Sequence, residues 1–161
     1  MWGFIGAKQK TAKANLMGPE FGDIWTWVAI DAETKLIPSF IIGKRDRYHA
    51  NAFMDDLASR LQSSTQISSD ALGVYKNAIE KAFGSEVGYG SVIKTFTQTD
   101  LAETRRYSPP EVLKIKKERV QGNPDMKTVS TSYVEKQNHT MRIHCRHLSS
   151  SKIGNQFALI I

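Results

Sequence analysis

Hydrophobic and polar residues alternate along the first part of the chain in the way that β-strands require. The apolar segment from Trp2 to Gly6 predicts a short strand, followed by a basic polar stretch and a turn at residues 17–20. Residues 24–30 alternate apolar and polar side chains around two tryptophans, and residues 35–42 resume an apolar pattern after a short polar interruption. These two runs predict a β-hairpin.

The middle of the chain changes to the spacing typical of helices. Apolar side chains recur at helical spacing from Tyr48 to Gln62, and Asp46 precedes this run as a plausible N-cap. The same spacing predicts a second helix from Gly73 to Phe83, which Gly84 ends because glycine readily adopts C-cap conformations. Both segments favour helices that bury one face against a sheet.

Short apolar segments flank the second of these helices. One lies around Ile67, and another runs from Tyr89 to Phe96. We interpret both segments as strands. The order of strand, hairpin, helix, strand, helix and strand indicates an α/β fold in which helices lie on a mixed sheet.

The pattern loosens between Thr97 and Met126, where we predict a basic insertion that carries a short strand. A stretch of this length without regular structure is unusual inside a compact domain and is often functional. Its basic residues are Arg105, Arg106, Lys114, Lys116, Lys117 and Arg119. Beyond the insertion, a last helix is predicted to start near Ser132. Its buried stripe is predicted to hold Val134, Met141, Cys145 and Leu148.

Composition narrows the classes of protein that the chain fits. Its 161 residues suit one domain, residues 1–161, and 40% hydrophobic residues allow a buried core. A formal net charge of +6 favours polyanionic partners, above all nucleic acid. The single cysteine, Cys145, excludes an internal disulfide and suits a reducing compartment. No apolar run has membrane-spanning length and no signal peptide is recognisable, so we expect a cytoplasmic protein without a membrane partner.

One carboxylate stands out near the start of the last predicted helix. Glu135 is the only acid between Ser130 and Arg142, and no Asp or Glu follows from Lys136 to Ile161. A phosphate chain and a divalent cation could share such a site, because basic and polar residues follow Glu135. We expect four of them to contact DNA, namely Lys136, Asn138, Arg142 and Arg146. Asp70 adds a second carboxylate at a predicted strand-to-helix junction, and two such acids are the core of a two-metal phosphoryl-transfer centre.

These residues also have structural interpretations. Ser132 and Glu135 match a capping box, and Asp70 could cap the helix that follows it. The cluster of His139, His144, Cys145 and His147 suggests zinc ligands. A structural zinc site needs four ligands in paired knuckles, however, and the sequence holds no second pair. We therefore expect the cysteine in the core and the histidines on a basic, DNA-facing or solvated surface.

Three blocks of the sequence resemble a known family. They are W-G-F-I-G-A-K at residues 2–8, D-I-W-T-W-V-A-I-D-A-E-T-K-L at residues 23–36, and G-N-P-D-M-K-T-V-S-T-S-Y-V-E-K-Q-N-H-T-M-R at residues 122–142. Together they resemble the catalytic domain of bacterial insertion-sequence transposases of the insertion sequence 1 type, and the resemblance runs from Trp2 to about Leu148. It implies an RNase H-like fold in which two aspartates and one glutamate bind divalent metal ions, Mg²⁺ or Mn²⁺, and drive DNA cleavage and joining.

The resemblance also implies roles for individual acids. By position, Asp70 is similar to the second acid of the family and Glu135 to the third, which makes both catalytic residues and metal ligands. The first acid of the family lies just ahead of the Trp-Gly-Phe segment, whereas this sequence begins at Met1. Asp31 is a substitute, although it lies in a predicted turn where an aspartate more simply bonds its own backbone. We therefore expect an inactive fragment without the first acid and the amino-terminal DNA-binding segment.

The same resemblance implies DNA as the partner, both transposon ends and target, and homo-oligomers in the active family. Two alternatives remain open. One alternative to the transposase catalytic domain is a non-catalytic basic DNA-binding fragment that associates with intact transposase, and the other is a different RNase H-like nuclease. A transposase or an RNase H-like nuclease needs a third acid near Asp70 and Glu135, whereas a DNA-binding fragment does not.

Overall fold

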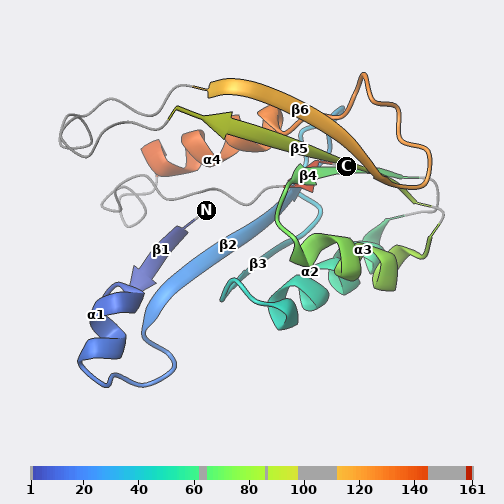
Figure 1. Cartoon of the computed structure of the whole chain (residues 1–161). Coiled ribbons are helices and arrows are strands. Elements are labelled where there is room, and N and C mark those ends of the chain that lie inside the picture. The colour runs from blue at the N-terminus through green and yellow to red at the C-terminus, as the bar shows by residue number, and fades with distance from the viewer. Residues whose placement is uncertain (1, 62–64, 86, 98–111, 145–158, 161) are drawn as a thin grey trace.

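Strands and helices alternate along most of the chain in the computed structural model, which describes residues 2–61, 65–85, 87–97, 112–144 and 159–160 (Figure 1). The strands are β1 (Trp2–Ile5), β2 (Gly22–Ile30), β3 (Phe40–Gly43), β4 (Gln66–Asp70), β5 (Gly88–Phe96), β6 (Val112–Gln121) and β7 (Leu159–Ile160). The helices are α1 (Gln9–Ala14), α2 (Arg47–Arg60), α3 (Val74–Phe83) and α4 (Ser132–His144). The predicted α/β class is confirmed.

The strands form one mixed sheet in the order β1-β2-β7-β4-β5-β6, with β3 paired to β2 on its other edge. Strands β1 and β3 are each antiparallel to β2, and the pairing of β2 with β3 is the one that the predicted hairpin requires. Strands β4 and β5 are parallel and are joined by α3, while β6 runs antiparallel to β5. The short strand β7 lies between the two groups, parallel to β2 and antiparallel to β4.

Helices α2 and α3 cover one face of this sheet. Trp27 and Ala29 of β2 point into a cluster with Phe53 of α2 and Tyr75 of α3, all of them buried. The ring of Trp27 meets that of Tyr75 edge-on, with centroids 5.7 Å apart. Burial of these aromatic side chains is the main favourable contribution to stability on this face.

The opposite face of the sheet carries α4. Successive side chains of a strand point to opposite faces, so Ile30 lies on the other side from Ala29. Ile30 packs with the fully buried Val134 of α4. In Figure 1, α4 correspondingly lies apart from the α2 and α3 pair. The sheet is therefore covered by helices on both faces.

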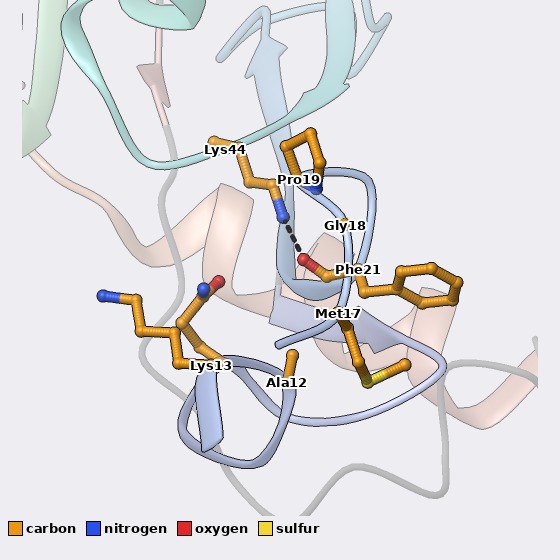
Figure 2. Close-up of a pocket in the computed structure, with 8 residues that line it drawn as sticks. Ala12, Lys13, Met17, Gly18, Pro19, Phe21 and Lys44 are labelled. Atoms are coloured by element: carbon orange, nitrogen blue, oxygen red, sulfur yellow. Dashed lines mark hydrogen bonds between the residues drawn. The ribbon is translucent and has the colours of Figure 1, made fainter. Parts of the chain in front are cut away.

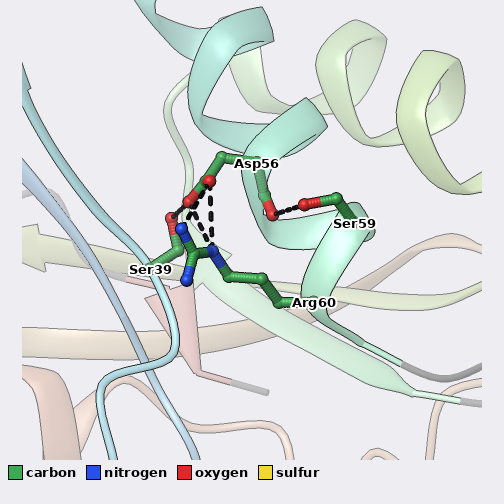
Figure 3. A network of polar contacts seen from close by, with 4 residues as sticks. All are labelled: Ser39, Asp56, Ser59 and Arg60. Atoms are coloured by element: carbon green, nitrogen blue, oxygen red, sulfur yellow. Dashed lines mark hydrogen bonds and ion pairs between the residues drawn. The ribbon is translucent and has the colours of Figure 1, made fainter.

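A polar network ties the segment before β3 to α2 (Figure 3). The hydroxyl of the buried Ser39 donates to Asp56 at 2.6 Å, and the guanidinium of Arg60 donates to the same carboxylate at 2.9 Å. Hydrogen bonds from Arg60 and then Ser39 lower the pKa of Asp56. The network fixes how α2 sits against the hairpin.

Several predicted elements agree with the structure. The predicted hairpin is formed by β2 and β3, and the helix predicted from Tyr48 to Gln62 is α2. Asp46 caps α2 by accepting a hydrogen bond of 2.9 Å from the His49 amide. The second helix, the strands beside it and the start of the last helix also lie where the sequence predicts them.

Elements α1 and β6 differ from the prediction, and β7 was not predicted. The basic stretch before residue 17 was predicted without a helix, but α1 forms there, with Ala12 as its buried residue. The predicted insertion at residues 97–126 contains β6, a strand of 10 residues where a short one was expected. Because β6 is exposed along most of its length and rich in lysine, it lacks the alternating pattern by which half-buried strands are recognised.

Candidate functional site

Asp70 is the last residue of β4 and lies on the face of the sheet that carries α4. The preceding residue, Ser69, points the other way, because its hydroxyl lies 2.7 Å from the hydroxyl of Tyr89 in the core. The carboxylate of Asp70 accepts a hydrogen bond of 3.2 Å from the Leu72 amide. Helix α3 begins later, with Gly73 as its N-cap, so Asp70 does not cap it.

The environment of Asp70 disfavours its negative charge. Burial, the largest cause, raises the pKa of this carboxyl to about 6 from an ordinary value of 3.8. The Leu72 amide and the positive charge of Arg45 act in the opposite direction, whereas the negative charge of Glu135 adds to the rise. The charge of Glu135 therefore acts on Asp70, although the two residues lie far apart in sequence.

Glu135 lies in the first turn of α4, and its Oε1 atom is held by two donors. The Thr131 hydroxyl donates to it at 2.7 Å, and the Lys94 ammonium forms an ion pair with the same oxygen. The backbone amide of Glu135 donates to the Thr131 carbonyl, and that of Ser132 donates to the Ser130 hydroxyl. These bonds replace the capping box that the sequence suggests for Ser132 and Glu135.

The fold of β5 explains how Lys94 reaches the helix. In the parallel register of β4 and β5, Asp70 is opposite Val92. Lys94 follows Val92 by two residues and therefore points to the same face, towards α4. Gly90 precedes Val92 by two residues and lets the segment before α4 approach β5. A Cβ atom at this position would meet the side chain of Val129 at 2.4 Å. Asp70, Lys94 and Glu135 thus lie on one face near the ends of β4 and β5.

Asp31 has a different place in the structure. It sits at the turn between β2 and β3, where its carboxylate accepts hydrogen bonds from the Glu33 amide at 2.9 Å and the Thr34 hydroxyl at 2.8 Å. The Glu33 amide is the main cause that lowers the pKa of Asp31. This is the turn-forming role that the sequence offered as the alternative to catalysis. Within the described part of the chain, no three His, Cys, Asp or Glu side chains gather as a metal-binding group.

The predicted DNA contacts on α4 have different outcomes. Lys136 is exposed. Asn138 is fully buried, and among the described residues neither its amide nitrogen nor its oxygen has a hydrogen-bond partner. Asn138 lies one turn after Glu135 on the inward side of the helix, away from solvent, and its contact with DNA stays a prediction. Arg142 belongs to α4, although its side chain is not described, and Arg146 lies outside the described residues.

No sequence pattern marks two charged residues of this region as part of the site. Lys94 belongs to a strand pattern that gives no hint of its partner on α4, and Arg45 follows β3 in an unremarkable polar stretch. Both are found only once β4, β5 and α4 are placed in space. Their positive charges balance the two acids of the site.

Strand β6 extends the basic character of the sheet beyond β5. Lys117 pairs with Val92 and Arg119 with Gly90, which places both on the face of α4. Lys114 and Lys116 point to the other face. All four basic side chains are exposed. The sequence included them in a basic insertion without indicating that they form a strand.

A pocket lies at the other end of β2, beside α1 (Figure 2). Ala12, Met17 and Phe21 line it, and the Lys44 ammonium donates to the Phe21 carbonyl at 2.9 Å. Neither Asp70 nor Glu135 lines it. The pocket is thus separate from the candidate site.

Comparison of the chain with protein-family models, with curated proteins and with solved structures finds no match. The resemblance to insertion-sequence transposases therefore stays a prediction. Among the described residues, no helix is long and apolar enough to span a membrane.

Proposed function

We propose that this protein carries part of a transposase-type site for metal-dependent phosphoryl transfer on DNA phosphodiesters. Asp70 and Glu135 are its ligands for Mg²⁺ or Mn²⁺, and the site is inactive without a third acid, which the described residues do not supply. The observation that carries the proposal is the placement of these two acids on one face of the sheet, near the ends of β4 and β5, where Lys94 of β5 forms an ion pair with Glu135. The proposal also rests on the family resemblance and on the α/β architecture, which is compatible with an RNase H-like fold. The same resemblance leads us to propose that the protein forms homo-oligomers, as members of the active family do.

The donor set suits a hard cation. Mg²⁺ is usually held by one or two carboxylates, with water and substrate phosphate oxygens completing its coordination. A half-buried Asp70 with a raised pKa and a like charge nearby is a carboxylate that a bound cation would stabilise in its charged form. Such a cation supplies charge neutralisation at the phosphoryl oxygens and activates the attacking oxygen.

The residues of the chain then have distinct tasks. Asp70 and Glu135 hold the cation, and Thr131 orients Glu135 through its hydroxyl at 2.7 Å. Ser69 and Tyr89 fix the end of β4 by their shared hydrogen bond. Lys117, Arg119 and Lys136 offer positive charge to the DNA backbone on the same face.

The test is nicking of supercoiled plasmid DNA in the presence of Mg²⁺ or Mn²⁺. We expect no nicking by the chain alone. When a strand segment that ends in an aspartate is added ahead of Trp2, nicking should appear, disappear with Asp70→Asn and with Glu135→Gln, and persist with Asp31→Asn. Nicking that survives both substitutions would contradict the assignment of the site. Loss of nicking with Asp31→Asn as well would show that the turn aspartate completes the acid set.

A second candidate function is DNA binding without chemistry. The specific observation that favours it is the exposed basic strand β6 together with a Glu135 carboxylate that Lys94 already occupies. This function predicts duplex binding that is weakened by salt and indifferent to Asp70→Asn. Absence of nicking in the extended protein, with such binding, would favour it.

A further inference from the structure

We propose that Lys94 is a resident cation of the candidate site, a positioning residue whose ammonium holds the Glu135 carboxylate until a divalent cation displaces it. The inference rests on the proposed function of Asp70 and Glu135. It adds a residue that competes with the metal ion for one carboxylate.

The contacts on Glu135 are the first observation. Its Oε1 atom receives both the Lys94 ammonium and the Thr131 hydroxyl, so the oxygen that faces the sheet is already charge-compensated. The Thr131 bond is local, within the first turn of α4, whereas Lys94 comes from a strand 41 residues earlier. Glu135 is therefore directed towards β5 by a cation of the protein itself.

The register of the sheet is the second observation. Lys94 follows Val92, the residue opposite Asp70, by two positions, so its side chain leaves the sheet on the face that carries both acids. A divalent cation bound by Asp70 and Glu135 would meet the same carboxylate. Two cations cannot both lie against one carboxylate oxygen without strong repulsion.

Partial exposure makes this exchange feasible. The side chain of Lys94 is 24% exposed and that of Glu135 is 41% exposed, so the ion pair borders solvent. Ion pairs of this kind contribute little to stability because water competes for both charges. A lysine on a flexible four-carbon stem can leave the carboxylate without disturbing β5.

The neighbouring strand offers a matched control. Lys116 of β6 also forms an ion pair with a glutamate, Glu118, and both side chains border solvent. Lys116 is opposite Ile93 in the sheet, so it points to the face away from α4. The same substitution at Lys116 therefore removes an equal charge and a similar ion pair outside the site.

The experiment measures Mn²⁺ binding to the DNA-free protein by electron paramagnetic resonance of the unbound ion. Wild type, Lys94→Met, Lys94→Arg, Lys116→Met and the double variant Lys94→Met with Glu135→Gln are compared. Circular dichroism confirms that each is folded. We expect Lys94→Met to bind Mn²⁺ about fivefold more tightly than wild type, the size of effect expected for a solvent-bordering ion pair. Lys94→Arg and Lys116→Met should match wild type, and the added Glu135→Gln should remove the gain.

The outcomes separate the two proposals. Glu135-dependent Mn²⁺ binding that is equal or weaker in Lys94→Met would overturn the role of Lys94 and leave the metal site standing. A gain of the same size in Lys116→Met would also overturn it, because the effect would then be one of net charge. If no variant binds Mn²⁺ through Glu135, both the role of Lys94 and the proposed function fall.

Discussion

The hydroxyl of Tyr89 lies 2.7 Å from that of Ser69, and this buried hydrogen bond joins β5 to β4 at the residue before Asp70. Tyr75 is the other buried tyrosine of the same cluster, and its hydroxyl has no hydrogen-bond partner in the part of the chain that the structure describes. Burial is the largest cause that raises the pKa of both phenols. The two buried tyrosines therefore differ in one respect: the Tyr89 hydroxyl is hydrogen-bonded, and that of Tyr75 is not bonded to any described residue.

Phenylalanine substitutions should separate them. Tyr89→Phe removes one partner of a buried hydrogen bond and should lower the free energy of unfolding by about 1–3 kcal/mol. Tyr75→Phe removes a hydroxyl that bonds none of the described residues, and it should be neutral or stabilising. Urea denaturation of both variants checks this expectation. A loss at Tyr75 as large as that at Tyr89 would show that its hydroxyl is bonded in solution.

Asp70→Asn should stabilise the protein at neutral and alkaline pH. The pKa of Asp70 is about 6 in the folded protein and near 3.8 when exposed, so the folded state disfavours the carboxylate. This costs nothing below pH 3.8, grows as the pH rises towards 6, and reaches on the order of 3 kcal/mol above it. Asparagine keeps an acceptor for the Leu72 amide and carries no charge.

The measurement is the free energy of unfolding of wild type and Asp70→Asn at pH 3.5 and pH 8. The variant should gain stability relative to wild type only at the higher pH. A difference that is independent of pH would contradict the burial of a charged Asp70. Added Mn²⁺ should stabilise wild type but not the variant if the proposed metal site is correct.

Binding to duplex DNA should fall steeply with salt, because phosphate contacts release counterions. Arg142→Ala with Arg146→Ala should reduce the slope of log K against log salt by about 2, close to one for each lost phosphate contact. Fluorescence anisotropy of a labelled duplex gives these slopes. Lys10→Ala with Lys13→Ala removes the same charge from α1, away from α4, and is the control. Equal changes in both double variants would contradict a local DNA-binding surface.

The N-cap of α2 allows a test of how much helix capping contributes to the stability of the protein. Asp46 accepts hydrogen bonds from the backbone amide of His49 at 2.9 Å and from its ring at 2.7 Å. Asp46→Ala should lower the free energy of unfolding by about 1 kcal/mol, since a helix-start amide loses its partner. Asp46→Asn retains a capping acceptor and should cost less. Thermal unfolding of wild type, Asp46→Ala and Asp46→Asn measures this difference. Equal losses in the two variants would contradict a capping role for the Asp46 side chain.

Elements with a strong apolar pattern were predictable from the sequence. The alternation around Trp27 indicates β2, and the helical spacing around Phe53 indicates α2, because each buries one face in the core. The turn at Asp31 was also recognisable, since its residue types bond their own backbone. In each case the local pattern and the tertiary environment agree.

The remaining features depend on contacts that no local pattern carries. Helix α1 buries only Ala12 among its residues, and β6 exposes its lysines on both faces, so neither shows a period. The burial of Asn138 depends on which side of α4 meets the sheet. The ion pair of Lys94 with Glu135 joins two elements whose distance in space the sequence does not encode locally.

The two-residue strand β7 has a consequence for how the chain matures during synthesis. Leu159 and Ile160 pair with Ala29 and Ile30 of β2 on one side and with Ser68 and Ser69 of β4 on the other. Residues 159–160 must therefore have left the ribosome before β7 can connect β2 with β4. Until then, the nascent hairpin and the nascent β4-α3-β5 unit have their facing edges open to chaperones.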